Sequence, residues 1–267
     1  MYEYIEVDFA DGVGRLTLNR PDKRNALKRD FITEIHAGIE QLKGHGSDLR
    51  CFVLAAHGSV FCAGMDLGEM QARAGADDGA AQLQKDSEVY CDVLTQIVQL
   101  DVPTVAAVSG PALAGGMGMI LACDILIASE NAFFMLPEPM RGITAAMVTP
   151  LLIHRIGAGP ASYMLLSGER VPAAAAGQMN LCHDVVPTEE FPKRIDSLIA
   201  AILTGSRSAL AITKQHIASS IDTDLVEQIK MSVSVSARAR ETEDAQEGLA
   251  AFLEKRKPNW QPAETGT

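Results

Sequence analysis

Hydrophobic and polar positions follow the period of a strand in some stretches of this chain and the period of a helix in others. Residues 2–21 alternate between the two kinds and turn at Asp11-Gly12, which predicts a β-hairpin. The next stretch has apolar residues at every third or fourth position: Leu27, Phe31, Ile35, Ile39 and Leu42. This spacing predicts an amphipathic helix over 24–43.

Short apolar runs and helical patterns then alternate up to about residue 187, as expected of an α/β fold with buried strands. The predicted strands cover 51–58, 104–110, 123–130, 132–136 and 181–187. The predicted helices begin at 65, cover 80–100, follow the glycine turn near 115, and cover 145–157, 159–169 and 171–179.

From about Glu189 the strand patterns stop, and helices are predicted over 189–205, 208–221, 225–241 and 242–256. The sequence therefore predicts an α/β section over 1–190 and a helical region over 191–267. The wide apolar faces of these last helices pack either against another subunit or against their own domain, and the pattern alone favours neither.

Composition and charge limit the classes of function. The chain has 267 residues, of which 47% are hydrophobic, and a net charge of -11. These values suit one large domain, or one domain with an appendage. The acidic balance disfavours nucleic acid as the main partner, because phosphate contacts need a basic face. The acidic, amphipathic N-terminus resembles neither a signal peptide nor a transit peptide, so a cytoplasmic location is expected.

Residues 102–128 are apolar and long enough to span a membrane. Turn-forming and charged residues interrupt them, at Pro103, Ser109, Gly110, Pro111 and Asp124. A strand, a turn, a helix and a second strand account for all five positions, so we expect no membrane span here.

Cysteines and histidines form no disulfide or metal-binding pattern. The number of cysteines is odd and they include no CxxC pair: Cys51, Cys62, Cys91, Cys123 and Cys182. We expect buried free thiols in a reducing compartment. The six histidines form no HExxH or HxxxH pattern, so no metal site is expected.

Two glycine-bearing turns stand between a predicted strand and a predicted helix. One contains Gly64 and Met65, and the other contains Gly115, Gly116 and Gly118. Unpaired N–H groups and the dipole at a helix N-terminus stabilise negative charge, so two such ends side by side would stabilise an enolate or a tetrahedral oxyanion. Tight packing of helix on strand is the alternative explanation for these glycines. Neither turn fits a phosphate-loop motif.

Glu138 is the candidate acid–base residue. It lies between two prolines directly after an apolar strand, where burial would raise its pKa into the range useful for proton transfer. The alternative is a turn glutamate paired with Arg141. Cys62 is a candidate nucleophile beside the first glycine turn, although a cysteine in such a place is more often a small apolar residue of the core.

Basic residues cluster at 20–28 and 252–258. In an acidic protein such clusters suit an anionic ligand such as a nucleotide phosphate, although solvated surface charge is the more common explanation.

Six motifs together resemble the crotonase, or enoyl-CoA hydratase/isomerase, family. In the family's order they are LNRPDKRNAL, FCAGMDL, VSGPALAGGMGMILACDILIA, FFMLPEPMRGI, GAGPASYMLLSGERVPAAAAGQMNLCHDVVP and EGLAAFLEKRKPNW. They cover nearly the whole chain. The resemblance implies a right-handed spiral of ββα units with a helical C-terminal trimerisation region, homotrimers or dimers of trimers, and a coenzyme A thioester as substrate with no further cofactor.

The resemblance also implies site residues. The thioester oxygen would lie between the backbone N–H groups of Met65 and Gly115, with Glu138 as acid and base. Residues of the first two motifs would contact coenzyme A: Lys23, Arg24, Ala26, Ala63, Gly64, Asp66 and Leu67. Phe252 and Lys255 match the family's C-terminal F-x-x-K, which reaches the nucleotide of coenzyme A, often in a neighbouring subunit.

The chain departs from the family's two-glutamate hydratases at Gly118, where those enzymes carry their first glutamate. Single-glutamate sites occur in isomerases of the family and in some hydratase-lyases. One carboxylate suffices for a 1,3-proton transfer. It also suffices for hydration if another group, such as Glu69, orients the water.

We therefore expect an enzyme of fatty acid metabolism that hydrates a 2-enoyl-CoA with one glutamate. The alternatives are a 3-enoyl-CoA to 2-enoyl-CoA isomerase, a C–C bond hydrolase that uses the same enolate, and a non-catalytic subunit that binds coenzyme A. Residues 142–152 after Glu138 are small and apolar, which permits a bulky or branched acyl chain.

Overall fold

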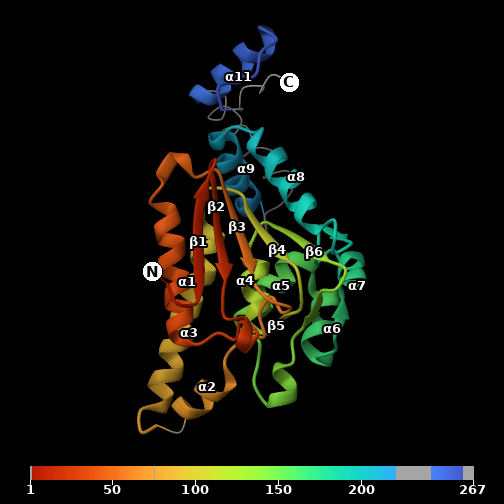
Figure 1. Cartoon of the computed structure of the whole chain (residues 1–267). Coiled ribbons are helices and arrows are strands. Elements are labelled where there is room, and N and C mark those ends of the chain that lie inside the picture. Colours follow the sequence, from red (N-terminus) through yellow and green to blue (C-terminus); the bar gives the residue numbers. More distant parts are fainter. Residues whose placement is uncertain (1, 75, 221–241, 261–267) are drawn as a thin grey trace. The chain divides into compact units, whose positions relative to one another are not determined.

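The computed structural model describes residues 2–74, 76–220 and 242–260, and the chain divides into two compact units (Figure 1). The first unit comprises Met1–Leu100 and Thr104–Ile195, and the second comprises Asp101–Pro103 and Asp196–Thr267. All strands of the described residues belong to the first unit.

A six-stranded sheet is the main sheet of the first unit. Its strands, in spatial order, are β1 (Ile5–Ala10), β2 (Val13–Leu18), β3 (Cys51–Ala56), β4 (Thr104–Val108), β6 (Ile125–Ser129) and β9 (Asp184–Val186). β1 and β2 are antiparallel and the other pairs are parallel. Asp11 and Gly12 join β1 to β2 with positive φ angles of 51° and 81°, which confirms the predicted two-residue hairpin.

A second, three-stranded sheet has the order β5 (Ala112–Leu113), β7 (Phe133–Met135) and β8 (Val171–Pro172). The chain passes from the large sheet to the small sheet and then into a helix, more than once. β4 is followed by β5 and α4 (Gly115–Ala122), and β6 is followed by β7 and α5 (Val148–Ile156). This repetition confirms the predicted spiral of ββα units.

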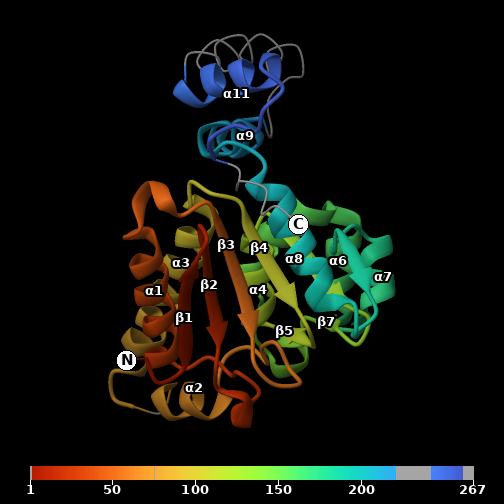
Figure 2. The same cartoon turned by 45° about the horizontal axis from the view of Figure 1, so that its top comes forward.

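The helices of the first unit cover the large sheet along its two sides. α1 (Arg29–Lys43) packs on β1 and β2 through its predicted apolar face, and α3 (Gly79–Gln99) packs against α1 and α4. Figures 1 and 2 show α1 and α3 along the β1–β2 edge, with α6 (Ala158–Ser167) and α7 (Ala173–Gln178) beyond the opposite edge of the sheet. α2 (Leu67–Ala74) precedes α3 and packs against it.

Two helices begin at least three residues later than the sequence predicts. The helix predicted from residue 24 begins at Arg29, because a short 3-10 turn at Pro21–Lys23 leads into Arg24 and Asn25, which have φ angles of 53° and 51°. Residues with positive φ cannot continue a right-handed helix. The helix predicted from residue 145 begins at Val148, so residues 142–147 form a loop between the turn at Glu138–Arg141 and this helix.

The second unit contains most of α8 (Phe191–Leu203), α9 (Arg207–Ser219) and α11 (Glu243–Leu253). The Ser206 hydroxyl accepts a hydrogen bond from the Ala209 N–H and caps the start of α9. The N–H and hydroxyl of Ser208 donate to Asp244, which links α9 to α11. The helix predicted over 225–241 lies outside the described residues.

Residues 102–128 form β4, β5, α4 and β6, as the interrupting residues predict. By itself, none of the described helices is long and apolar enough to span a membrane. The bent pair of α8 and α9 meets that length and composition only when the two are taken together. All five cysteines are free thiols, and the expectation that they are buried is wrong only for the exposed Cys91.

Candidate active site

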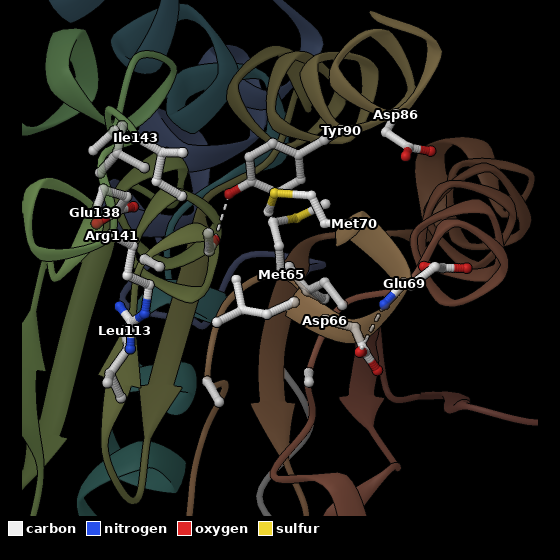
Figure 3. A pocket seen from close by; sticks show the side chains of 18 of the residues that line it. Met65, Asp66, Glu69, Met70, Asp86, Tyr90, Leu113, Glu138, Arg141 and Ile143 are labelled. Carbon is white, nitrogen blue, oxygen red and sulfur yellow. Dashed lines mark hydrogen bonds between the residues drawn. The ribbon is translucent and has the colours of Figure 1, made fainter. Parts of the chain in front are cut away.

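A cavity of about 780 Å³ opens within the first unit, between the ends of successive spiral turns and the buried face of α3 (Figure 3). Its lining comes from five segments, which span 22–27, 63–70, 83–90, 113–115 and 138–148. Met65, Gly115 and Glu138, which the sequence assigns to the chemistry, all line it.

Strand register explains why these three residues meet. In the small sheet Ala112 pairs with Phe134, and an isolated parallel bridge joins Cys62 to Ala112. Met65 and Gly115 each follow their bridge residue by three positions, and Glu138 follows Phe134 by four. The spiral thus brings equivalent points of three successive turns to one cavity.

The N–H of Met65 points away from the neighbouring strand. Leu27 donates its N–H to the Gly64 carbonyl and accepts from the Asp66 N–H, both at 2.8 Å. In a parallel bridge of this kind, the residue between the two bonded neighbours directs its own N–H to the opposite side. That side is the cavity, which Met65 lines.

Gly115 is the first residue of α4, so its N–H has no partner within the helix. The preceding Ala114 has a φ of 48° and a ψ of −123°, a conformation that is costly for a residue with a Cβ. The Ala114 N–H donates to the Met135 carbonyl at 3.0 Å and fixes this turn. Within the described part of the chain, neither the Met65 N–H nor the Gly115 N–H donates a hydrogen bond.

Glu138 begins a 3-10 turn at Glu138–Arg141 and is only 7% exposed. Its Oε2 has no hydrogen-bond partner among the described residues. Burial raises the pKa of this carboxyl above its usual value, against smaller opposing effects of its own N–H and of Arg141. The predicted alternative, an ion pair with Arg141, is not what the structure has, since the Arg141 guanidinium donates to the Pro137 carbonyl at 3.3 Å.

Tyr90 is a site residue that the sequence reasoning missed. It is 2% exposed, lines the cavity from α3, and donates its hydroxyl hydrogen to the Gly115 carbonyl (Figure 3). A Cβ at Gly118 would lie 2.2 Å from the Tyr90 hydroxyl oxygen. The available signal was the helical spacing of Tyr90 with Asp86, Val93 and Leu94, which predicts that it faces inward.

Glu69 does not stand in for a glutamate at position 118. Its carboxylate accepts from the Arg73 guanidinium at 2.8 Å and from the Arg29 N–H at 3.1 Å. Figure 3 shows it on the Asp66 side of the cavity, across Met65 from Glu138. Both carboxylate oxygens are thus engaged at the rim.

Most of the predicted coenzyme A contacts line the same cavity. They are Lys23, Arg24, Ala26, Ala63, Asp66 and Leu67. Gly64 is not a lining residue. The Asp66 carboxylate accepts from Arg20 at 3.0 Å. Burial by itself would raise the pKa of Asp66, but the hydrogen bond and charge of Arg20, together with the N–H groups of Glu69 and Gly68, outweigh burial and hold this pKa below its usual value. A carboxylate fixed in this way repels phosphate, so a phosphate of coenzyme A would bind elsewhere in the cavity.

Asn25 supports this part of the cavity and was also missed. It is fully buried, and its side-chain amide donates to the carbonyls of His57 and Val60, both at 2.9 Å. Its side-chain oxygen accepts from the Arg20 N–H at 2.8 Å. Asn25 therefore links the basic turn, which comprises residues 20–28, to the loop after β3 by hydrogen bonds.

Cys62 is a core residue. Its thiol is fully buried and donates to the Asn25 carbonyl at 3.1 Å, and burial raises its pKa to about 12. A thiol with this pKa is protonated at neutral pH, so it is a poor nucleophile. No group of three potential metal ligands occurs within the described ranges.

Phe252 and Lys255 belong to the second unit. Lys255 is exposed, and the side chain of Phe252 lies outside the described residues. Their contact with coenzyme A stays a prediction.

Comparison with known proteins shows which family the chain belongs to. A family model described as enoyl-CoA hydratase/isomerase matches residues 8–263. The 2,3-dehydroadipyl-CoA hydratase of Escherichia coli is 34% identical over 92% of this chain and 93% of its own length. A putative enoyl-CoA hydratase of Thermus thermophilus is 30% identical over 91% of this chain and 95% of its own. The crystal structure of an enoyl-CoA hydratase from Mycobacterium smegmatis, 31% identical, superposes with a TM-score of 0.88 over 97% of this chain and 99% of the other.

Proposed function

This chain belongs to the enoyl-CoA hydratase/isomerase family of enzymes, and we propose that it hydrates a 2-enoyl-CoA with Glu138 as both base and acid. One observation carries the proposal. A buried carboxylate with an unpartnered oxygen faces the same cavity as two backbone N–H groups that donate to nothing within the described residues. The hydratase names of the relatives support hydration as the reaction.

The two N–H groups would act on the thioester oxygen. With hydrogen bonds from Met65 and Gly115, the carbonyl is polarised, and the negative charge of an enolate is stabilised where it develops. Preorganised donors of this kind are worth about 3 kcal/mol each in a site that excludes water.

Glu138 would move the protons. Its carboxylate accepts a proton from water as the water oxygen bonds to C3, and the C2=C3 electrons shift to give the enolate. The enolate then reforms the thioester carbonyl while C2 takes the proton from the Glu138 carboxyl. The net change is addition of H and OH across C2=C3. A raised pKa suits this exchange, because the group must be a base in one half and an acid in the other.

The acyl chain would lie against the loop after Glu138. Ala145, Ala146 and Ile143 line the cavity there, with the exposed side chain of Ile143 at its edge. These small and apolar side chains favour a bulky or branched acyl chain over a polar one. Coenzyme A would extend past Ala63 and Leu67 toward the basic turn.

Isomerisation of a 3-enoyl-CoA is the second candidate. Glu138 would remove a proton from C2 and return it to C4 of the dienolate. The observation that favours this reaction is Gly118, because no carboxylate stands there to orient a water and the space is filled by Tyr90.

We further propose a homotrimer or dimer of trimers in the cytoplasm, with no cofactor besides the coenzyme A of the substrate. Leu166 and Ile217 support self-association, since these apolar side chains are 81% and 62% exposed in the single chain. Light scattering at micromolar concentration tests the assembly, and a monomer there would contradict it.

The decisive experiment is mass spectrometry of 2-enoyl- and 3-enoyl-CoA thioesters after incubation with the enzyme and with Glu138→Gln. Hydration adds the mass of one water to a 2-enoyl-CoA. Isomerisation leaves the mass unchanged and shifts the chromatographic position of a 3-enoyl-CoA. Glu189→Gln, at an exposed position of the first unit, is the control. Full activity of Glu138→Gln would overturn both candidates.

A further inference from the structure

We propose that Tyr90 is a positioning residue of the oxyanion hole, whose hydroxyl holds Gly115 so that its N–H faces the thioester oxygen. The role rests on the proposed function, because it concerns the same thioester. It extends that function to a residue of α3, the helix that lies between Met65 and β4 in the chain.

The Tyr90 hydroxyl bonds to Gly115, whose backbone has little else to restrain it. Gly115 has no side chain to restrict its backbone, and it follows Ala114 in a strained conformation. Such strain persists only where the surroundings fix it from several directions. The Met135 carbonyl holds Ala114 on one side, and the Tyr90 hydroxyl holds the Gly115 carbonyl on the other.

Gly118 makes room for this contact. A Cβ there would lie 2.2 Å from the hydroxyl oxygen and 3.2 Å from the ring carbon that bears it. Any side chain at position 118 would therefore displace the hydroxyl from Gly115. Tyr90 and Gly118 form a pair in which the hydroxyl occupies the space that a residue at 118 would otherwise fill.

The hydroxyl is suited to act as a donor and not as a base. Tyr90 is buried, and burial raises its pKa well above the usual value, with further contributions from Cys62 and Glu138. It therefore keeps its proton for the Gly115 carbonyl, and proton transfer to substrate falls to Glu138.

A double-mutant cycle tests the pair. Tyr90→Phe removes only the hydroxyl, and we expect kcat to fall by about tenfold with little change in KM, because a loosened oxyanion donor affects the transition state most. Gly118→Ala should cause a similar loss in the otherwise unaltered enzyme. In the Tyr90→Phe background Gly118→Ala should cost clearly less, since the nearest ring atom would be 3.2 Å from the new Cβ instead of a hydroxyl oxygen at 2.2 Å. Equal costs of Gly118→Ala in both backgrounds would overturn the proposal.

A spectroscopic readout separates positioning from mere packing. Butyryl-CoA labelled with ¹³C at its carbonyl is unreactive, and its C=O stretch should shift to lower frequency when it binds between two N–H donors. We expect a smaller shift with Tyr90→Phe and an unchanged one with Tyr2→Phe, which loses a surface hydroxyl bonded to Gln41. Thermal unfolding shows whether each variant is folded. If Tyr90→Phe does not fold, the C=O stretch is measured with Gly118→Ala, which should also displace the hydroxyl.

The outcomes distinguish this role from the proposed function. An unchanged shift and an unchanged kcat in Tyr90→Phe would overturn the role of Tyr90 and leave the proposed function intact. If butyryl-CoA fails to bind the unaltered enzyme and no enoyl-CoA is turned over, the proposed function itself fails, and the role of Tyr90 fails with it.

Discussion

Gly64 lies so close to Ala114 that a Cβ on Gly64 would be 2.5 Å from the Cβ of Ala114. The two residues belong to different spiral turns, and each directly precedes a residue whose N–H lines the cavity. The contact therefore sets how closely the Met65 and Gly115 donors approach each other. Gly64 also has a φ of 88°, which L side chains rarely adopt.

Gly64→Ala should impair both stability and activity. The clash and the strained φ together should lower the free energy of unfolding by roughly 2–4 kcal/mol. If the donors move apart, kcat/KM should fall by about 100-fold or more, as when an oxyanion donor is lost. Urea unfolding and steady-state kinetics measure the two effects.

Gly159→Ala is the matched control. Gly159 lies in α6, and a Cβ there meets no described atom within 4 Å. Gly159 is the second residue of α6 and precedes Pro160, which offsets the better helix propensity of alanine, so stability should change by less than about 1 kcal/mol with activity unchanged. If Gly64→Ala behaved like this control, the positions of the Met65 and Gly115 donors would not depend on the contact between Gly64 and Ala114.

Glu138 should set the acid limb of the pH profile. Its carboxylate form starts hydration, and burial raises its pKa above the usual 4.5. The kcat/KM of the enzyme should therefore fall as pH decreases through a midpoint above 4.5, and approach a tenfold loss per pH unit below it. A midpoint at or below 4.5 would show that the reacting enzyme does not bury this carboxyl as the structure does.

Local pattern predicted much of the fold because it depends on neighbours in sequence. Alternation and an Asp-Gly pair define the β1–β2 hairpin, and helical spacing defines the buried face of α1. The start of α1 could not be predicted in this way, because Asn25 has a positive φ and its side chain is held by the carbonyls of His57 and Val60, which are distant in sequence. The pattern also places the start of α5 too early, since this helix begins at Val148 after a turn at 146–147.

The candidate site was predictable where a motif fixes backbone position, as at Met65, Gly115 and Glu138. Close packing explains why glycine occupies positions 64 and 116. A Cβ on Gly116 would lie 2.7 Å from Cys62. The contact between Tyr90 and Gly118 could not be predicted from the sequence, because the two residues lie 28 positions apart and only the packing of α3 on α4 brings them together.

Glu138→Gln should stabilise the protein at neutral pH while it removes activity. In the unfolded chain Glu138 loses its proton near its usual pKa of 4.5, whereas the folded protein retains it to higher pH. Between the two values the folded state binds more protons, so stability falls as pH rises. The gain from Glu138→Gln should be absent below 4.5, grow through the folded pKa and then stay constant. Thermal unfolding at several pH values measures it. Glu189→Gln, which is exposed, should show no such trend.

Asn25→Ala should weaken the fold and the coenzyme A contacts more than the chemical step. The change leaves the carbonyls of His57 and Val60 and the N–H of Arg20 without the partner that Asn25 supplies. Asn25 is fully buried but its three hydrogen bonds are part-buried, so at about 1 kcal/mol for each lost bond we expect a loss of roughly 3 kcal/mol in the free energy of unfolding. The basic turn would loosen, so KM should rise more than kcat falls.

Asn19→Ala is the control for Asn25→Ala, because the Asn19 side chain makes one exposed hydrogen bond, to Glu6 at 3.0 Å. It should change stability by less than about 0.5 kcal/mol. Urea unfolding together with calorimetric titration of coenzyme A alone compares the two variants. If Asn25→Ala lowered kcat and left coenzyme A affinity intact, the turn at 21–26 would act on the reacting atoms and not on the nucleotide. That result would move the coenzyme A contacts to Ala63 and Leu67.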